Sequence, residues 1–165
     1  MKETPLTRKI CEDMRPGKLS LPGFLGDDHD VMRRLDDDHE AVKQFDLTHE
    51  RMAARMRELR DAGTEGLGQF ISVPPHFEVR VDSARGRIPC PFGERGLYPK
   101  TNITVRNLAS RREISFTDLH IHLIAAHGFY EGRGTPFRLE PADLVAILEV
   151  PRGSDDLLRG VSWRA

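Results

Sequence analysis

The hydrophobic period of this sequence changes abruptly near residue 65, and this change restricts the fold more than any other feature. Between residues 28 and 62, apolar side chains recur every three or four positions, which is typical of amphipathic helices. Three glycines between Gly63 and Gly68 interrupt this pattern. From Phe70 onward apolar and polar residues alternate, as in strands with one buried face. Helices followed by closely spaced strands predict an α+β fold with a small antiparallel sheet.

Capping and turn residues set the expected boundaries of the elements. Helices are expected over residues 28–45, 48–62, about 118–127 and 141–149. The link between the first two is so short that an antiparallel helical hairpin over 28–62 is predicted, with Thr48 as the N-cap of the second helix. A sheet with helices packed on it should occupy 70–150, with a loop over 82–86 between its first strand and a short returning strand.

The length of 165 residues is that of one domain. The chain divides into an extended N-terminal arm (1–26), a single α+β domain (27–150) and a loose C-terminal tail (151–165). The arm carries apolar side chains among turn-forming prolines and glycines. We therefore expect it to lie across the core or across a partner chain, so a protein partner or a dimer is expected.

Composition restricts the environment in which the protein works. No apolar run approaches the roughly 18 residues that a membrane span needs, so no membrane partner is expected. The N-terminus has no apolar signal-peptide core. Two cysteines, Cys11 and Cys90, do not make a secreted disulfide framework, and they favour a reduced, cytoplasmic protein.

Charge is unevenly distributed, although the net charge is only −1. Residues 27–40 hold seven acidic and two basic residues, whereas residues 80–112 hold eight basic and two acidic residues. Either an acidic helix docks on a basic sheet, or the basic sheet face binds nucleic acid or another anion. The candidate anion-binding residues are Arg85, Arg87, Arg95, Lys100, Arg106, Arg111 and Arg112.

Three of the seven histidines fall within eight residues, from His120 to His127. Imidazole nitrogens suit zinc and other divalent transition metals, and a cysteine thiolate adds to that preference. The candidate metal ligands are Cys90, Asp118, His120, His122 and His127.

The spacing His122-x4-His127 after a turn that carries Cys90 resembles the helix half of a zinc finger. This resemblance implies a zinc ion held by these three side chains. A fourth ligand remains open among His120, His76, Asp118 and water.

The overlapping pattern Asp118-x-His120-x-His122 resembles the first metal-binding strand of the amidohydrolases, which implies a metal-dependent hydrolase. A third interpretation needs no metal. Thr117 and Gly128 would then bound a plain core helix whose histidines bind carbonyl or carboxylate groups.

Three functions follow from these patterns, and the sequence does not decide whether the protein is an enzyme. The first is a small cytoplasmic accessory or regulatory protein that acts through binding and carries a Cys/His zinc site. The second is a small metal-dependent hydrolase, and the third is a nucleic-acid-binding module.

Overall fold

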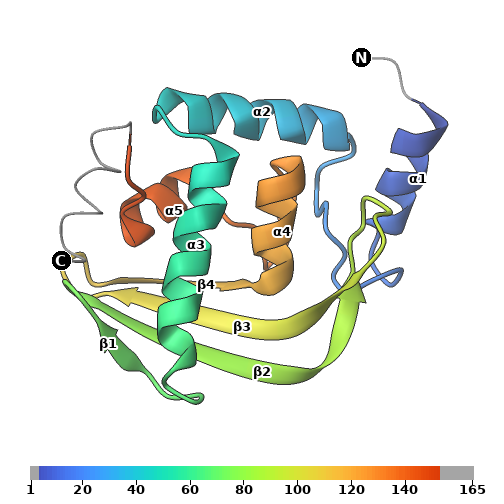
Figure 1. The fold of residues 1–165 in the computed structure, drawn as a ribbon. Helices are drawn as coiled ribbons and strands as arrows, with labels where there is room; N and C mark the ends of the chain where they lie inside the picture. The colour runs from blue at the N-terminus through green and yellow to red at the C-terminus, as the bar shows by residue number, and fades with distance from the viewer. Residues whose placement is uncertain (1–3, 153–165) are drawn as a thin grey trace.

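The computed structural model describes residues 4–152, which form an α+β fold (Figure 1). The described helices are α1 (Pro5–Asp13), α2 (Val31–Gln44), α3 (His49–Thr64), α4 (Asp118–His127) and α5 (Pro141–Leu148). The described strands are β1 (Ile71–Val73), β2 (Phe77–Pro89), β3 (Leu97–Asn107) and β4 (Arg112–Thr117). They form one antiparallel sheet in the order β1-β2-β3-β4.

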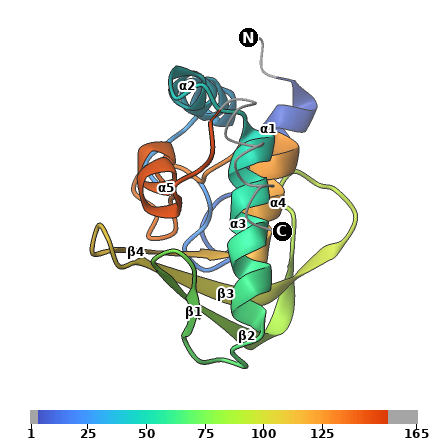
Figure 2. The same cartoon turned by 60° about the vertical axis from the view of Figure 1, so that its left-hand side comes forward.

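Helices α3, α4 and α5 cover one face of the sheet, and both views show α2 lying beyond them (Figures 1 and 2). The alternation of apolar and polar residues that predicted the strands places one set of side chains between the sheet and these helices. The strands contribute Phe77, Val79, Ile103, Val105 and Phe116, each at most 1% exposed. The helices contribute Met52, Met56, Leu59, Ile124 and Leu144 to the same cluster. The predicted fold class is therefore confirmed.

Helices α2 and α3 do not pack as the antiparallel pair predicted over 28–62. Thr48 caps α3 as predicted, since its hydroxyl accepts from the Arg51 amide at 3.2 Å. However, α2 crosses over one end of α3 in both views instead of lying along it (Figures 1 and 2). The short link from Phe45 to Thr48 includes Asp46 at φ 56°, a left-handed residue that turns the chain sharply.

The N-terminal arm is helical in part, which corrects the prediction of an extended segment over 1–26. Thr4 and Thr7 form a capping box, and Pro5 occupies the first helical position of α1. After α1 the chain is irregular, and Met14, Phe24 and Leu25 lie in a second apolar cluster that also holds Cys90. Most of the predicted tail over 151–165 lies outside the described residues.

Strand β2 continues through the segment predicted as a loop. Residues 82–86 belong to β2, and the register with β3 shifts between Ser83 and Arg87, as at a β-bulge. The chain reverses later, between Pro89 and Leu97. This delayed reversal carries Cys90 to the end of the sheet, beside α4.

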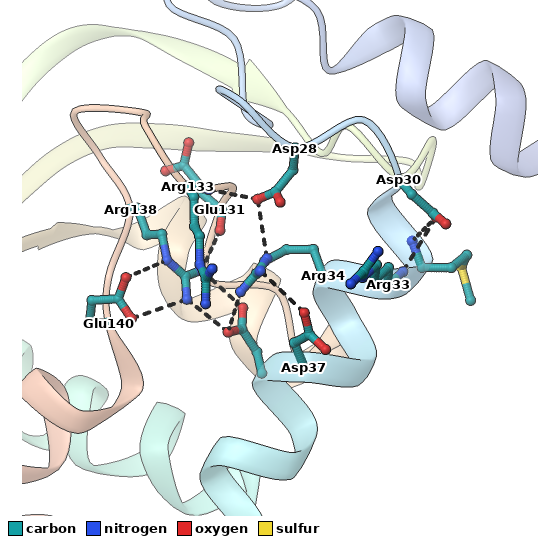
Figure 3. A network of polar contacts seen from close by, with 11 residues as sticks. Asp28, Asp30, Arg33, Arg34, Asp37, Glu131, Arg133, Arg138 and Glu140 are labelled. Atoms are coloured by element: carbon teal, nitrogen blue, oxygen red, sulfur yellow. Dashed lines mark hydrogen bonds and ion pairs between the residues drawn. The ribbon is translucent and has the colours of Figure 1, made fainter.

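A polar network joins α2 to the segment before α5, and Figure 3 shows its arrangement. Asp38 is 2% exposed and accepts from both guanidinium groups of the network, Arg34 at 3.2 Å and Arg138 at 2.8 and 3.0 Å. Arg34 also lies 3.1 Å from Asp28, and Arg138 donates to Glu140 at 2.7 Å. The acidic stretch of the sequence thus neutralises buried arginines, so part of its charge is structural.

His49, at the start of α3, connects this region to the core. Its Nδ1 lies 2.9 Å from the hydroxyl of buried Tyr130, and its Nε2 lies 3.3 Å from Nδ1 of His39. Burial lowers the pKa of His49 below its ordinary value of 6.5, and nearby His39 lowers it further, while Asp38 opposes the shift.

Acidification is therefore expected to destabilise the fold through His49. The unfolded chain takes up a proton near pH 6.5, whereas the folded chain takes it up at lower pH. The contribution of His49 to the free energy of unfolding is complete above pH 6.5. It declines as the pH falls from 6.5 toward the lower pKa of the folded state. Urea unfolding at pH 7.5 and 5.5 should show that His49→Gln loses less stability than the wild type on acidification. One group contributes at most about 1.4 kcal/mol per pH unit. Identical pH dependence in the two proteins would contradict this assignment.

Candidate metal centre

Four side chains from two parts of the fold converge beside the end of β2. Cys90 follows β2, Glu94 lies in the turn before β3, and His122 and His127 belong to α4. One potential ligand atom from each of them lies within 4.8 Å of the other three. The Glu94 carboxylate is 2.7 Å from His122 Nε2 and 3.2 Å from His127 Nε2, and the Cys90 sulfur is 3.6 Å from His127 Nε2.

Local signals position the two histidines. Helix α4 begins after the N-cap Thr117 and ends at Gly128, whose φ of 63° is left-handed. Five positions separate His122 and His127, so they differ by about 140° around the helix axis. Their rings are nonetheless close, with centroids 5.5 Å apart and planes at 84°. Two nitrogens that approach from different directions suit a tetrahedral ion better than a planar arrangement.

Aromatic side chains from the β2–β3 region hold both imidazoles. Phe92 stacks on His127 with centroids 4.0 Å apart and an interplanar angle of 8°. Tyr98 stacks on His122 at 4.3 Å, and its hydroxyl lies 2.9 Å from His122 Nδ1. The Nε2 atoms of His122 and His127 both lie near Glu94. For His122, the contact of Nδ1 with Tyr98 matches a metal-binding histidine whose second nitrogen has a separate hydrogen-bonding partner.

The turn that carries Glu94 depends on glycine. Gly93 and Gly96 have φ of 85° and 116°, conformations that other residues adopt only with strain. They allow the chain to reverse between Cys90 and β3 and to present the Glu94 side chain to α4. Glu94 is the most exposed of the four, with 44% of its side chain accessible, against 18% for His122 and 17% for His127.

One nitrogen at this centre lacks a well-aligned partner. His122 Nε2 is buried and makes no hydrogen bond within the described structure, although it lies only 2.7 Å from Glu94. The distance qualifies as an ion pair, but the direction does not suit a hydrogen bond. A divalent cation between this nitrogen and the Glu94 oxygen would take both atoms as ligands.

Burial favours neutral forms of two of the four groups. It raises the pKa of the Cys90 thiol and lowers the pKa of His127. Burial opposes ionisation of Glu94 as well, but His127 and His122 outweigh it and lower the pKa of that carboxyl group. A metal bound here would therefore displace the thiol proton, because thiolate is the form that coordinates.

Two of the sequence-predicted ligands lie elsewhere. His120 is 4% exposed, and its ring forms hydrogen bonds with Thr117, Glu131 and the Phe137 carbonyl. Asp118 pairs with Arg60 at 2.8 Å. The strand-like pattern Asp118-x-His120-x-His122 fails because α4 already begins at Asp118, and alternate residues of a helix diverge.

Glu94 was missed as a fourth candidate ligand, although the sequence does contain a signal for it. It follows Cys90 by four positions, between two glycines in a turn. Nothing in the local sequence shows that this turn packs against α4, so the residue was not recognised.

The basic residues do not form a single patch. Arg112 lies opposite Asn107 at one end of β3, whereas Arg87 lies opposite Pro99 toward the other end. Arg106 pairs with Glu113 at 2.7 Å, and Arg112 pairs with Asp143 at 2.7 Å. The other five residues are exposed: Arg85, Arg87, Arg95, Lys100 and Arg111.

Comparisons with protein families, with curated proteins and with solved structures find no match for this chain. Among the helices of residues 4–152, none combines the length and apolar character that crossing a bilayer demands. The case for function thus rests on the geometry of the four converging side chains.

Proposed function

We propose that this protein binds one zinc ion, or a closely similar divalent transition metal, through Cys90, Glu94, His122 and His127. The observation that carries the proposal is the convergence of four ligand atoms within 4.8 Å of one another. One thiolate, two imidazoles and one carboxylate are all established zinc ligands, and four protein ligands complete a tetrahedral site.

A metal at this position would connect two separate parts of the chain. Cys90 and Glu94 belong to the β2–β3 turn, and His122 and His127 belong to α4, so the ion would fix the turn against the helix. A site with four protein ligands leaves no open position for a substrate, which suits a structural role. We therefore assign the protein an accessory or regulatory role through binding, in a reducing compartment that keeps Cys90 free.

The hydrolase alternative gains no support from this geometry, because Asp118 and His120 are engaged by Arg60 and Glu131. The nucleic-acid alternative needs a shared basic surface. The described structure distributes those residues toward both ends of the sheet and pairs two of them with acids. Neither alternative has a specific observation in its favour.

Elemental analysis of the purified protein tests the proposal. We expect about one equivalent of zinc in the wild type after exposure to zinc and removal of the excess. The double replacement His122→Ala and His127→Ala should retain less than about a tenth of it, because losing two of four ligands leaves too few to hold the ion.

His29→Ala is the matched control, since His29 is exposed and lies outside the cluster. Circular dichroism should show that every variant compared is folded. Zinc content that survives the double replacement in a folded protein would overturn the proposal, as would a wild type that retains no metal.

A further inference from the structure

A groove follows strand β4, which lies at the edge of the sheet beside α5 (Figures 1 and 2). It has a volume of about 640 Å³ and is lined by every residue of β4, by residues 136–140 and by Asp143 and Ile147 of α5. This volume is within the range of ligand-binding pockets. None of the four candidate metal ligands lines the groove, so it is separate from the candidate metal centre.

The backbone of β4 has unpaired hydrogen-bonding groups along this groove. Successive residues of an antiparallel strand point their N–H and C=O groups alternately toward one neighbour and the other. The Thr117 amide donates to His120 Nδ1 at 3.0 Å and not to β3, so residues 113 and 115 also direct their groups away from β3. Within residues 4–152, no other segment forms a backbone hydrogen bond with Glu113 or Ser115 on that side. Each of these two residues thus presents a free donor and a free acceptor, at the spacing of a strand.

The groove also offers apolar surface. Phe116, Leu139 and Ile147 belong to its lining, and each is at most 4% exposed. Phe137 lines it as well but is 50% exposed, although its side chain is large and apolar. Successive side chains of a strand point to opposite faces, so a strand beside β4 would place every second side chain over this surface.

The charges on the rim of the groove favour a basic partner. Three lining carboxylates have 47–53% of their side chains exposed: Glu113, Glu140 and Asp143. Two of them pair with arginines that are exposed to a similar degree, Arg106 and Arg112. The third partner, Arg138, is only 7% exposed and is shared with buried Asp38. Three exposed carboxylates thus face two exposed guanidinium groups when every ion pair is counted, and this excess attracts a Lys or Arg side chain.

We infer that this groove binds an extended peptide with alternating apolar and basic residues, which joins the sheet as a strand beside β4. The free groups of Glu113 and Ser115 pair with its main chain, which supplies donors and acceptors at the same spacing. Its apolar side chains cover Phe137, and its basic side chains neutralise the rim. The inference gives the proposed binding role a class of partner, but it does not depend on the metal.

Titration of the full chain with a synthetic peptide tests the inference. The probe is a hexapeptide, blocked at both ends, in which Lys and Val alternate, and its binding is followed by isothermal titration. We expect saturable binding with or without zinc, and slower hydrogen exchange of the Glu113 and Ser115 amides in the complex. A peptide with Glu in place of Lys should bind at least about fivefold more weakly, and the difference should shrink as salt is added.

Ser115→Pro tests the pairing with the backbone. This substitution removes a free amide of β4 but no hydrogen bond to β3, so the fold should be retained. We expect peptide binding to weaken at least about fivefold. Ser72→Pro is the matched control, because it places proline in β1, the opposite edge strand, outside the groove. Circular dichroism should show that both variants are folded, and Ser72→Pro should bind the peptide like the wild type.

Phe137→Ala keeps the test decisive if the proline variant does not fold. The Phe137 ring is half exposed, so its loss should spare the fold and weaken peptide binding about fivefold. Leu108→Ala removes another half-exposed apolar side chain that lies outside the groove, and it should leave peptide affinity unchanged.

Three results would refute the inference. The first is a wild type that does not bind the Lys/Val peptide, and the second is unchanged binding in the folded variants Ser115→Pro and Phe137→Ala. The third is a wild-type dimer that Ser115→Pro converts to a monomer, because the edge of β4 would then belong to a second copy of the chain. Each measurement is made without zinc as well, so its failure is distinguishable from failure of the proposed metal site.

Discussion

Zinc is expected to raise the melting temperature of the wild type by roughly 5–10 °C when its free concentration is about a hundredfold above the dissociation constant. Cys90→Ser should lose most of this increase. The ion binds the folded chain, in which Cys90, Glu94 and the two histidines converge, and the unfolded chain brings none of them together. Cys90 is 3% exposed and supplies the only sulfur of the set, so its replacement removes the ligand with the strongest preference for zinc.

Differential scanning calorimetry with and without zinc measures the effect within each variant. This comparison separates loss of the ligand from any packing cost of replacing a buried thiol with a hydroxyl. Cys11→Ser is the matched control, because Cys11 is the other free cysteine and lies outside the metal-ligand cluster. An equal zinc-induced increase in wild type and Cys90→Ser would exclude Cys90 from the site.

The sequence predicted those parts of the fold that are specified by local chemistry. Thr48 and Thr117 were assigned as caps from their position before apolar helices, and both hydroxyls accept from the amide three residues on. Alternation predicted which strand residues face the core, and Phe77 and Val79 are buried as expected. Such features depend on a few neighbouring residues, so one sequence is enough to indicate them.

Features decided by tertiary packing were harder to predict. A loop was predicted over 82–86, whereas β2 continues through these residues with a register shift between Ser83 and Arg87 and ends at Pro89. Helix α2 is joined to the segment before α5 by the buried contacts of Asp38 with Arg34 and with distant Arg138. No local pattern specifies a partner 100 residues away.

The candidate site was partly predictable for the same reason. The histidine spacing and Cys90 identified three of the four residues, because their chemistry stands out in the sequence. Glu94 is one of many acidic residues and is distinguished only by the turn that brings it to α4. His120 matched the metal-ligand pattern as closely as His122 and His127 did. Its position on α4, however, directs its side chain toward Glu131.

A large loss of stability is expected from Asp38→Ala. The Asp38 side chain is 3% exposed and contacts Arg34 and Arg138, whose side chains are 4% and 7% exposed. Removing it leaves two guanidinium groups in a buried environment without their shared carboxylate. Breaking a buried ion pair by removing one partner costs about 3–5 kcal/mol. Asp28, Asp37 and Glu140 still contact the arginines, so we expect the loss to stay within that range (Figure 3).

Urea unfolding measures this loss, and Asp38→Asn extends the test if the alanine variant fails to fold. The amide keeps an acceptor but removes the charge, so it should destabilise the protein less than alanine does. Asp36→Ala is the control, because Asp36 lies on the same helix and is exposed. The free energy of unfolding of this variant should stay within about 0.5 kcal/mol of the wild-type value. If Asp38→Ala were as mild as Asp36→Ala, the network would contribute little to stability. The acidic stretch over 27–40 would then have to be explained by something outside the fold, such as a basic partner.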